Sequence, residues 1–385
     1  MASPFVLDKY VTGKDFIGRK EESKILGNLL SQGEHVVMYE PAKSGKKSLL
    51  QQTLFNMKMQ GRQFTVTQMS VFNLRTSEDF LLRLGSTAMG AFASTPSEYS
   101  SFVSELLGGT HFVFDPRRFA DHDEPVSTGW ALDDSDMAAM LRLPHALAKS
   151  RGRHLIVIID EFQNVSLFED DWKLLKSFET VVKEMRQAGA PIPGCTFVLC
   201  GSQVNAMKDI FEHHRYFYRN IERLALSPVS DREIVEHAVR GFLSGGKVVD
   251  RELLHGACRL FKNNLWYINH LLYICDSLSK GYIVESTLME ALRQLISIHE
   301  PRFLSIMNSL TTHQVSLLRA ILEGYSKFST AEVIDKYALN SSANVKRVKD
   351  ALMKKEVITF NEKDEPIVLD PLFEHWVRKE YFGMK

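Results

Sequence analysis

Two short segments of the sequence carry residue types that bind and activate phosphate groups. The first runs from Glu40 to Ser48 and reads Glu-Pro-Ala-Lys-Ser-Gly-Lys-Lys-Ser, between an apolar run at 35–39 and a helical pattern. A strand, a tight loop and a helix N-terminus in this order direct backbone N–H groups and the helix dipole at one spot. Gly45 lets the backbone approach an anion closely, and Lys46 supplies a cation. The segment therefore predicts a phosphate-binding loop.

Two positions depart from the pattern G-x-x-x-x-G-K-[ST]. Glu40 stands where the first glycine is expected, and Lys47 stands where a hydroxyl should bind Mg²⁺. A carboxylate at about 4 Å from a phosphate charge costs about 4 kcal/mol at an effective dielectric near 20, unless it turns outward. Ser48 comes one residue late and faces about 100° away on the helix. A lysine-rich helix start without ligand is the alternative. The candidate loop residues are Ser44, Gly45, Lys46, Lys47 and Ser48.

The second segment is a fully apolar run at 155–159 that ends in Asp160 and Glu161. Such a run is typical of a strand buried on both faces, and ligands bind at the carboxyl ends of strands in open α/β sheets. Asp160 would hold Mg²⁺, and Glu161 would act as general base for the attacking water. The alternative is a buried strand with an acidic end. Both segments together predict binding of ATP or ADP, with Mg²⁺ in doubt because Lys47 replaces the hydroxyl.

The elements that must position these residues follow an alternating pattern. Apolar strand-like runs alternate with amphipathic helical stretches up to residue 228, which predicts a parallel sheet covered by helices. The expected strands are 35–39, 64–71, 155–159, 196–200 and 221–226. Helices are expected at 77–92 and 134–149. The connection 108–133 between them, rich in Ser, Gly, Asp and Pro, is interpreted as a surface loop inserted in the domain, without an assigned function.

The rest of the chain changes character twice. Residues 229–300 show helical periodicity and no convincing strand, and Ser230 with Glu233 forms a capping box. Residues 301–385 show three helices and then two short strands, the order of a winged helix-turn-helix. The predicted fold class is α/β: a P-loop NTPase core at 1–228, a small helical lid at 229–300 and a winged helix at 301–385.

Composition limits the partners. Basic and acidic residues number 47 each, so no overall field draws the chain to DNA or to an anionic membrane. No apolar run has the length of a membrane span, and no membrane partner is expected. Cys195 and Cys200 bracket one expected strand and would lie about 16 Å apart, too far for a disulfide. Reduced thiols favour a cytoplasmic protein.

A family resemblance adds to these patterns. The segment from Phe16 to Glu22, Phe-Ile-Gly-Arg-Lys-Glu-Glu, resembles the F-[IV]-G-R-x-x-E box of AAA+ proteins. The segments 211–218 and 221–228 resemble the archaeal-type ATPase branch of the STAND NTPases, which carries a C-terminal winged helix. The resemblance implies that Phe16, Gly18 and Arg19 pack beside adenine. It also implies a polar sensor of the γ-phosphate after the fourth strand, at Ser202 and Gln203.

The sequence departs from this family in the lid. A small G-x-P motif that touches nucleotide is replaced by Asn263-Asn264-Leu265. Arg215 and Arg219 lie where related proteins keep an arginine finger, and surface arginines on a helix end are the alternative. Eroded motifs beside an intact Asp-Glu pair favour nucleotide binding over useful hydrolysis.

The winged helix leaves DNA binding open. Its third helix, expected at 342–355, presents Lys346, Arg347 and Lys349 as candidate phosphate contacts. The hairpin tip at 361–365 is acidic and would be repelled by DNA, which favours packing on the chain itself or on a partner protein.

Three hypotheses follow. The first is a STAND-type switch that responds to nucleotide, with weak or absent hydrolysis by Glu161, Ser202 and Gln203, acting through a protein partner or self-association. The second is a DNA-binding AAA+ ATPase. The third is a pseudo-ATPase that serves as an interaction scaffold.

Overall fold

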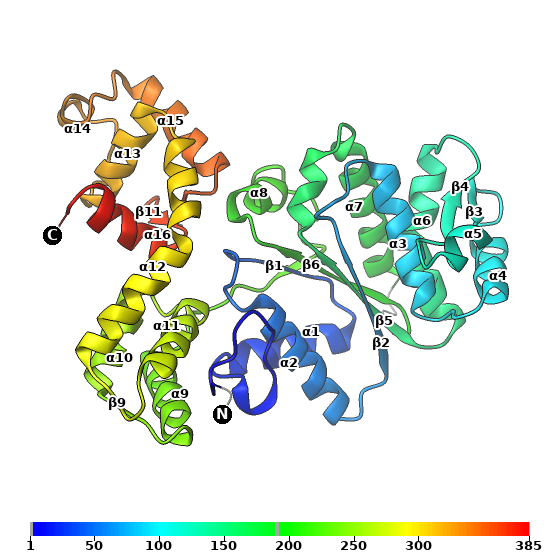
Figure 1. Ribbon diagram of the computed structural model, residues 1–385. Coiled ribbons are helices and arrows are strands. Elements are labelled where there is room, and N and C mark those ends of the chain that lie inside the picture. Colours follow the sequence, from blue (N-terminus) through cyan, green and yellow to red (C-terminus); the bar gives the residue numbers. More distant parts are fainter. Residues whose placement is uncertain (1–2, 189–191, 385) are drawn as a thin grey trace. The chain divides into compact units, whose positions relative to one another are not determined.

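A computed structural model describes residues 3–188 and 192–384, and the chain divides into two compact units (Figure 1). The first, here called the sheet unit, comprises Lys20–Glu40 and Leu49–Leu226. The second, here called the helical unit, comprises Met1–Arg19, Pro41–Ser48 and Ser227–Lys385. The chain thus enters the helical unit three times, once through the predicted phosphate-binding loop.

The sheet unit is built on five parallel strands in the order β2-β5-β6-β1-β7. The strands are β1 (Val36–Tyr39), β2 (Phe64–Ser70), β5 (His154–Asp160), β6 (Cys195–Gly201) and β7 (Glu222–Arg223). All five predicted strands are confirmed. Every residue of β1, β5 and β6 is buried, as expected for apolar strands covered on both faces. One strand, β6, therefore separates β1 from the strand that ends in the two carboxylates.

Helices cover both faces of this sheet. In Figure 1, α1 and α2 lie on one side, and α3, α6 and α7 lie on the other. Their bounds are α1 (Lys20–Gln32), α2 (Lys46–Met59), α3 (Ser77–Gly90), α6 (Asp134–Ser150) and α7 (Asp171–Gln187). Aromatic side chains fill the space beneath α7, where Phe178 packs edge-on against Phe197 with ring centroids 4.8 Å apart. Short turns η2 (Phe162–Leu167), α8 (Val204–Lys208) and η3 (Asp209–His213) complete the unit.

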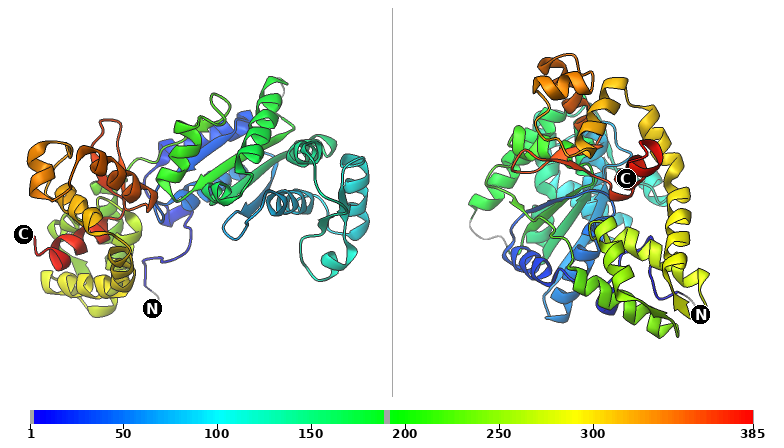
Figure 2. Two further views of the ribbon diagram at one scale, coloured as in Figure 1. Left: turned by 90° about the horizontal axis from the view of Figure 1, so that it is seen from above. Right: turned by 90° about the vertical axis from the view of Figure 1, so that its left-hand side faces the viewer.

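The prediction of a loop at 108–133 is wrong in one respect, because this segment contains secondary structure. Strands β3 (Phe112–Phe114) and β4 (Val126–Thr128) form an antiparallel pair around α5 (Pro116–Ala120), and α4 (Pro96–Leu106) precedes them. Phe114 and Phe119 pack against Tyr99 of α4, with centroids 6.0 and 5.4 Å from its ring. This small aromatic core orders the segment beside α3 and α6 (Figures 1 and 2).

In the helical unit, the helical periodicity predicted after residue 228 corresponds to four helices. They are α9 (Asp231–Ser244), α10 (Arg251–Leu260), α11 (Leu265–Leu278) and α12 (Glu285–Asn308). Ser230 is the N-cap of α9, and its hydroxyl accepts from the backbone N–H of Glu233 (3.3 Å). Two strands that the sequence did not predict, β8 (Val248–Val249) and β9 (Tyr282–Ile283), pair in parallel. Two-residue strands are too short to show a periodicity.

The winged helix follows the predicted order of elements. It consists of α13 (Thr312–Leu322), α14 (Ala331–Lys336), α15 (Ser342–Lys354), β10 (Ile358–Phe360) and β11 (Pro366–Val368), followed by α16 (Pro371–Trp376) and η4 (Val377–Tyr381). Buried apolar residues from Val229 to Val377 form one hydrophobic core. Helix α12 runs through Pro301 and across the expected domain boundary. The division at 228 and 300 stays a prediction.

None of the helices described in this structure is both long enough and apolar enough to span a membrane.

Candidate phosphate-binding site

The loop Pro41–Ser48 joins the end of β1 to α2, which begins at Lys46. Gly45 has φ +94°, and a Cβ added there would lie 2.8 Å from Nη1 of Arg19. Lys43 also has a positive φ, 64°. The ammonium group of Lys46 donates to the carbonyl oxygen of Pro41 (3.0 Å) and to Oγ of Ser44 (3.4 Å). A cation and a left-handed glycine thus stand at a helix N-terminus, which is the arrangement that a phosphate group requires.

Arg19 fixes this loop from the N-terminal segment. Its Nη1 donates to the carbonyl oxygen of Ser44 (2.6 Å), and its Nε donates to the carbonyl oxygen of Ser227 (3.2 Å). Gly18 has φ +66°, and an added Cβ would lie 2.7 Å from Val229. Gly18 and Arg19 therefore connect the loop with the start of the helical segment, a role that the sequence did not reveal. Phe16 is half-buried at the end of η1 (Gly13–Asp15), and its adenine contact stays a prediction.

The hydroxyl groups of the loop offer little to a metal ion. Oγ of Ser48 accepts a hydrogen bond from the backbone N–H of Val11 (3.2 Å), so this hydroxyl ties the N-terminal segment to α2. Lys47 is exposed, and an ammonium group cannot ligate a cation. The loop therefore fits a phosphate anion better than it fits Mg²⁺.

The carboxylate of Glu40, expected to repel phosphate, has a hydrogen-bond donor in the structure. Its Oε1 accepts a hydrogen bond from the backbone N–H of Leu226 (3.2 Å), just beyond β7. The carboxylate thus serves as an acceptor for a backbone group of the sheet unit.

At the carboxyl end of β5, Asp160 and Glu161 differ in their surroundings. Asp160 is the last residue of the strand and 7% exposed. Glu161 follows in the left-handed region, with φ +54°. Its Oε2 accepts from Oγ of Ser202 (2.6 Å) and from Nε2 of Gln163 (2.6 Å). Ser202 follows the neighbouring strand β6, so the structure brings two predicted residues together.

Gln163 was not found by sequence reasoning. It lies in η2, is 3% exposed, and its Oε1 has no hydrogen-bond partner among the described residues. The patterns considered in the sequence do not include this position, and its hydrogen bond to Glu161 identifies it. Gln203, in contrast, is exposed at the N-cap of α8, where its side chain makes no capping hydrogen bond.

The asparagines that replace the G-x-P motif hold the beginning of α11. Oδ1 of Asn264 accepts from the backbone N–H groups of Trp266 (3.1 Å) and Tyr267 (3.2 Å). Nδ2 of Asn263 donates to the carbonyl oxygen of Val229 (2.9 Å) and to Asp231 (2.7 Å). The segment in the position of the G-x-P motif thus has a structural role as a helix cap.

Comparisons with solved structures agree on the architecture. A Walker-type ATPase of Pyrococcus abyssi is 18% identical over 97% of this chain and 99% of its own, with a TM-score of 0.66. The ORC2 protein of Aeropyrum pernix in ADPNP–ADP complexes is 14% identical over 95% of this chain and 93% of its own, with a TM-score of 0.54. The family described as a probable winged helix domain matches residues 301–379. The chain has the fold of a P-loop ATPase with a C-terminal winged helix. No curated protein matches it.

The other arginines considered for this ATPase fold lie at the surface. Arg215 and Arg219 are exposed, and their guanidinium groups lie 5.6 and 5.2 Å from the ring of Tyr218. A finger role for either residue stays a prediction.

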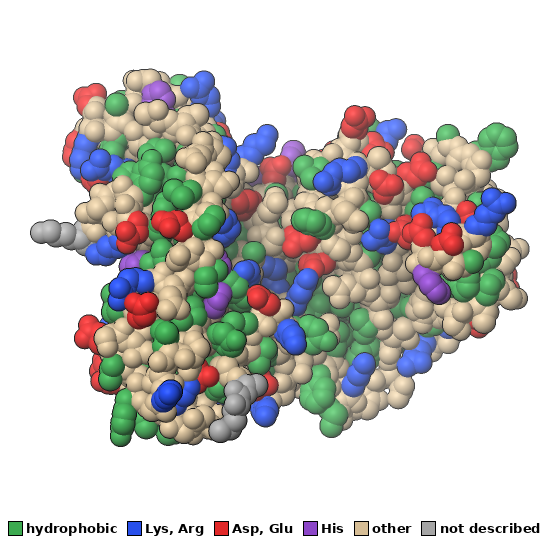
Figure 3. All heavy atoms as spheres, viewed as in Figure 1, with side chains coloured by type: hydrophobic (Ala, Val, Ile, Leu, Met, Phe, Trp, Pro, Cys, Tyr) green, Lys and Arg blue, Asp and Glu red, His purple; other side chains and the backbone are tan. Residues whose placement is uncertain are grey.

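The winged helix presents a mixed surface. Lys346 and Arg347 are exposed on α15. The third predicted contact, Lys349, lies 3.1 Å from the carboxylate of Asp364 and 3.6 Å from the ring centroid of Phe360. The acidic hairpin thus engages one cation of the proposed DNA-binding stripe. Acidic and basic side chains are also interspersed over the face drawn in Figure 3.

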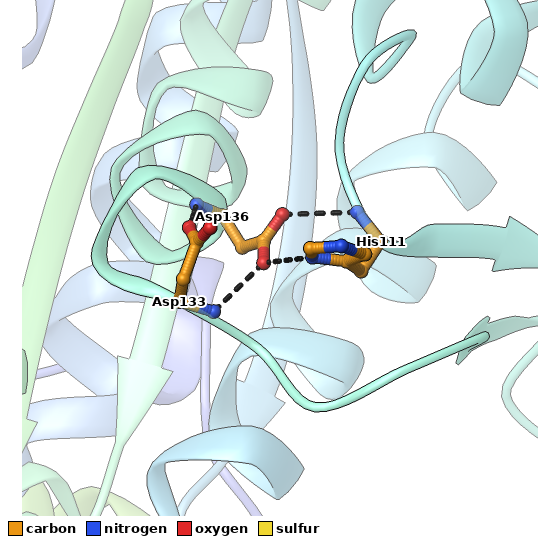
Figure 4. A group of neighbouring side chains, drawn as sticks. All are labelled: His111, Asp133 and Asp136. Atoms are coloured by element: carbon orange, nitrogen blue, oxygen red, sulfur yellow. Dashed lines mark hydrogen bonds and ion pairs between the residues drawn. The ribbon is translucent and has the colours of Figure 1, made fainter.

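A further cluster, in the insertion, joins His111 to Asp133 and Asp136 (Figure 4). Oδ1 of Asp136 accepts from the backbone N–H of His111 (2.9 Å), and its Oδ2 accepts from Nδ1 of His111 (2.8 Å) and the backbone N–H of Asp133 (2.8 Å). Both oxygens of the 1%-exposed Asp136 thus carry donors. The cluster contains the capping box of α6 and anchors β3, and each oxygen of Asp136 already accepts at least one hydrogen bond within it.

Proposed function

We propose that this chain binds ATP or ADP and acts as a nucleotide-responsive switch, with weak or absent hydrolysis. The observation that carries the proposal is the loop itself: Lys46 begins α2 with its ammonium group at the loop, and Gly45 has the backbone conformation that a close phosphate contact needs. Gly45 and Lys46 would bind the phosphates, with Ser44, Lys47 and Ser48 beside them. Phe16, Gly18 and Arg19 would lie on the adenosine side.

Weak hydrolysis is supported by the state of Glu161. Its Oε2 already accepts two hydrogen bonds, so this oxygen must give one up before it can accept a proton from the attacking water. Ser202 and Gln203 would sense the γ-phosphate. Asp160 would hold Mg²⁺ through water, with phosphate oxygens completing the coordination. Lys47 would neutralise phosphate charge where the usual hydroxyl ligand is missing.

Shared architecture gives further support, because the ORC2 protein of similar fold was solved with ADP and ADPNP. A switch needs only a difference in nucleotide affinity between two arrangements of the chain, so slow turnover is compatible with the role.

Calorimetric titration with ATP and ADP, with and without Mg²⁺, tests the proposal. Lys46→Ala should abolish binding, whereas Lys58→Ala, an exposed lysine in the last turn of the same helix, should not change it. Equal affinity with and without Mg²⁺ would mean that Lys47 replaces the metal. No binding of either nucleotide at millimolar concentration would refute the switch and favour the interaction scaffold.

A DNA-binding ATPase is the second candidate, favoured by the two exposed cations on α15, Lys346 and Arg347. Binding to duplex DNA should weaken steeply with salt and be lost in the double variant Lys346→Glu and Arg347→Glu. A salt-independent interaction, or none, would instead favour a protein partner or self-association.

A further inference from the structure

We propose that Lys43 of the phosphate-binding loop and Trp266 of α11 form a relay that reports nucleotide binding to the winged helix. The inference rests on the proposed function and deepens it, because it names how the loop would act on the rest of the helical unit. All of its residues lie in that unit.

The first link is a cation over an aromatic ring. Nζ of Lys43 lies 3.2 Å from the ring centroid of Trp266, within the range of a strong cation–π contact. The indole Nε1 donates to Oδ1 of Asp8 (3.2 Å), which fixes the ring from its edge. Partial burial lowers the pKa of Lys43, while Asp8 opposes this shift. When no phosphate is bound, Lys43 thus connects the loop with α11.

The second link connects the lid to the winged helix. Tyr267, next to Trp266, donates from its hydroxyl to Oδ2 of Asp370 (2.8 Å). Arg302 on α12 donates to the same hydroxyl (3.0 Å) and pairs with Asp370. Burial raises the pKa of Tyr267, so its hydroxyl remains a donor.

The end point of this chain of contacts is a helix cap. Asp370 is the N-cap of α16, and its Oδ1 accepts from the backbone N–H groups of Leu372 and Phe373, both at 3.0 Å. A cap contributes about the same free energy to a short helix as to a long one. Its loss therefore removes a larger share of the stability of a short helix such as α16. The position of Tyr267 therefore bears directly on the order of α16.

The surroundings of Trp266 explain why a charged partner matters there. The rings of His270 and His299 lie 5.3 and 5.5 Å from the indole, and one nitrogen of each has no hydrogen-bond partner among the described residues. Burial lowers the pKa of both histidines, that of His299 to about 4. Both rings are therefore neutral near pH 7, and Lys43 is the cation on the face of Trp266.

A bound phosphate competes for that cation. Lys43 lies three residues before Lys46 in the loop proposed to bind phosphate, and both Lys43 and Gly45 have a positive φ. A charge-assisted contact with phosphate is stronger than a contact with a ring face. Nucleotide would therefore draw Lys43 away from Trp266 and loosen the arrangement of Tyr267 on the cap of α16.

Hydrogen exchange over residues 370–381, read by mass spectrometry, tests the relay. In the wild type, ADP at saturating concentration should speed exchange of this segment. Lys43→Ala and Trp266→Leu should speed it without nucleotide, and ADP should add less than twofold. Lys14→Ala, an exposed lysine in the N-terminal segment, serves as the control. Unchanged exchange in both variants would overturn the relay.

A calorimetric arm separates the two proposals. Since coupling is reciprocal, Trp266→Leu should tighten ADP binding, on the order of fivefold. A variant that binds ADP as the wild type does would also overturn the relay. If the wild type binds no nucleotide, the proposed function fails, while faster exchange in nucleotide-free Lys43→Ala would still establish the contact from the loop to α16.

Discussion

The proposed phosphate-binding loop and the carboxyl end of β5 differ in how their sequences and their geometry match the expected patterns. The loop has lost two residues of its pattern, at Glu40 and Lys47, yet Gly45 and Lys46 keep the conformation and position that an anion requires. The end of β5 keeps both carboxylates of its pattern, yet Glu161 is engaged by two donors. Agreement with a sequence pattern and side-chain geometry can therefore differ. The loop that departs from its pattern has a left-handed glycine beside a lysine at a helix N-terminus, whereas in the segment that matches its pattern one oxygen of Glu161 already accepts two hydrogen bonds.

The largest expected effect comes from breaking the loop geometry. Gly45→Val places a β-branched residue at φ +94° and against Arg19. The strain, about 1–3 kcal/mol, should weaken ADP binding by about 10- to 100-fold. Calorimetry measures it, with the exposed, positive-φ Gly61→Ala as control for a glycine that has open space. Unchanged affinity would mean that nucleotide does not contact this loop.

Acid should act on the sheet unit through one buried histidine. His35, just before β1, is buried with Nδ1 accepting from the backbone N–H of Phe197 (3.0 Å), and burial lowers its pKa from 6.5 to about 3. Between these values the unfolded chain binds a proton that the folded chain does not, so stability falls as pH drops through this window.

The expected loss from pH 7 to pH 5 is about 2 kcal/mol for this one histidine. Urea unfolding of the wild type and of His35→Gln measures it, and the variant should lose correspondingly less. An equal slope in both proteins would show that His35 is protonated without cost in the folded chain.

The sequence predicted most of the strands and helices but few of the side-chain contacts between distant segments. Apolar strands and helix caps such as Ser230 follow from local patterns, because burial and capping leave periodic signals. The contacts of Arg19 with residues 44 and 227 join segments far apart in the chain, and no local pattern encodes them. The pairing of β3 with β4 was missed because the order of this segment comes from two phenylalanine rings that pack against Tyr99 and against each other.

A smaller effect should appear at Glu161. Gln163→Met keeps the volume of the side chain and removes one donor to Glu161. Oε2 of Glu161 then keeps a single donor and can accept from the attacking water, so ATP hydrolysis should rise about fivefold, about 1 kcal/mol in the barrier. A phosphate-release assay measures it, and Glu161→Gln in the same background should remove the gain. A lower rate in Gln163→Met would mean that the hydrogen bond positions Glu161 for catalysis.

The smallest effect is expected at Glu40. Glu40→Ala removes the acceptor for the backbone N–H of Leu226, at a cost of about 1 kcal/mol in the free energy of unfolding. Because the carboxylate serves the sheet unit, ADP affinity should change less than threefold. Urea unfolding and calorimetry on one preparation measure both quantities. A gain in affinity of tenfold or more would show that Glu40 does repel the phosphates.

Helix α12 is a single long helix that can transmit a tilt from one of its ends to the other. Its 24 residues span about 36 Å at 1.5 Å per residue, and they begin among the lid helices and end at the first helix of the winged helix. A tilt of about 10° at one end of a rod of that length displaces the other by about 6 Å. Arg302, which contacts Tyr267 and Asp370, projects from this rod one residue after Pro301. A sub-ångström adjustment at the lid can thus be amplified mechanically at the winged helix.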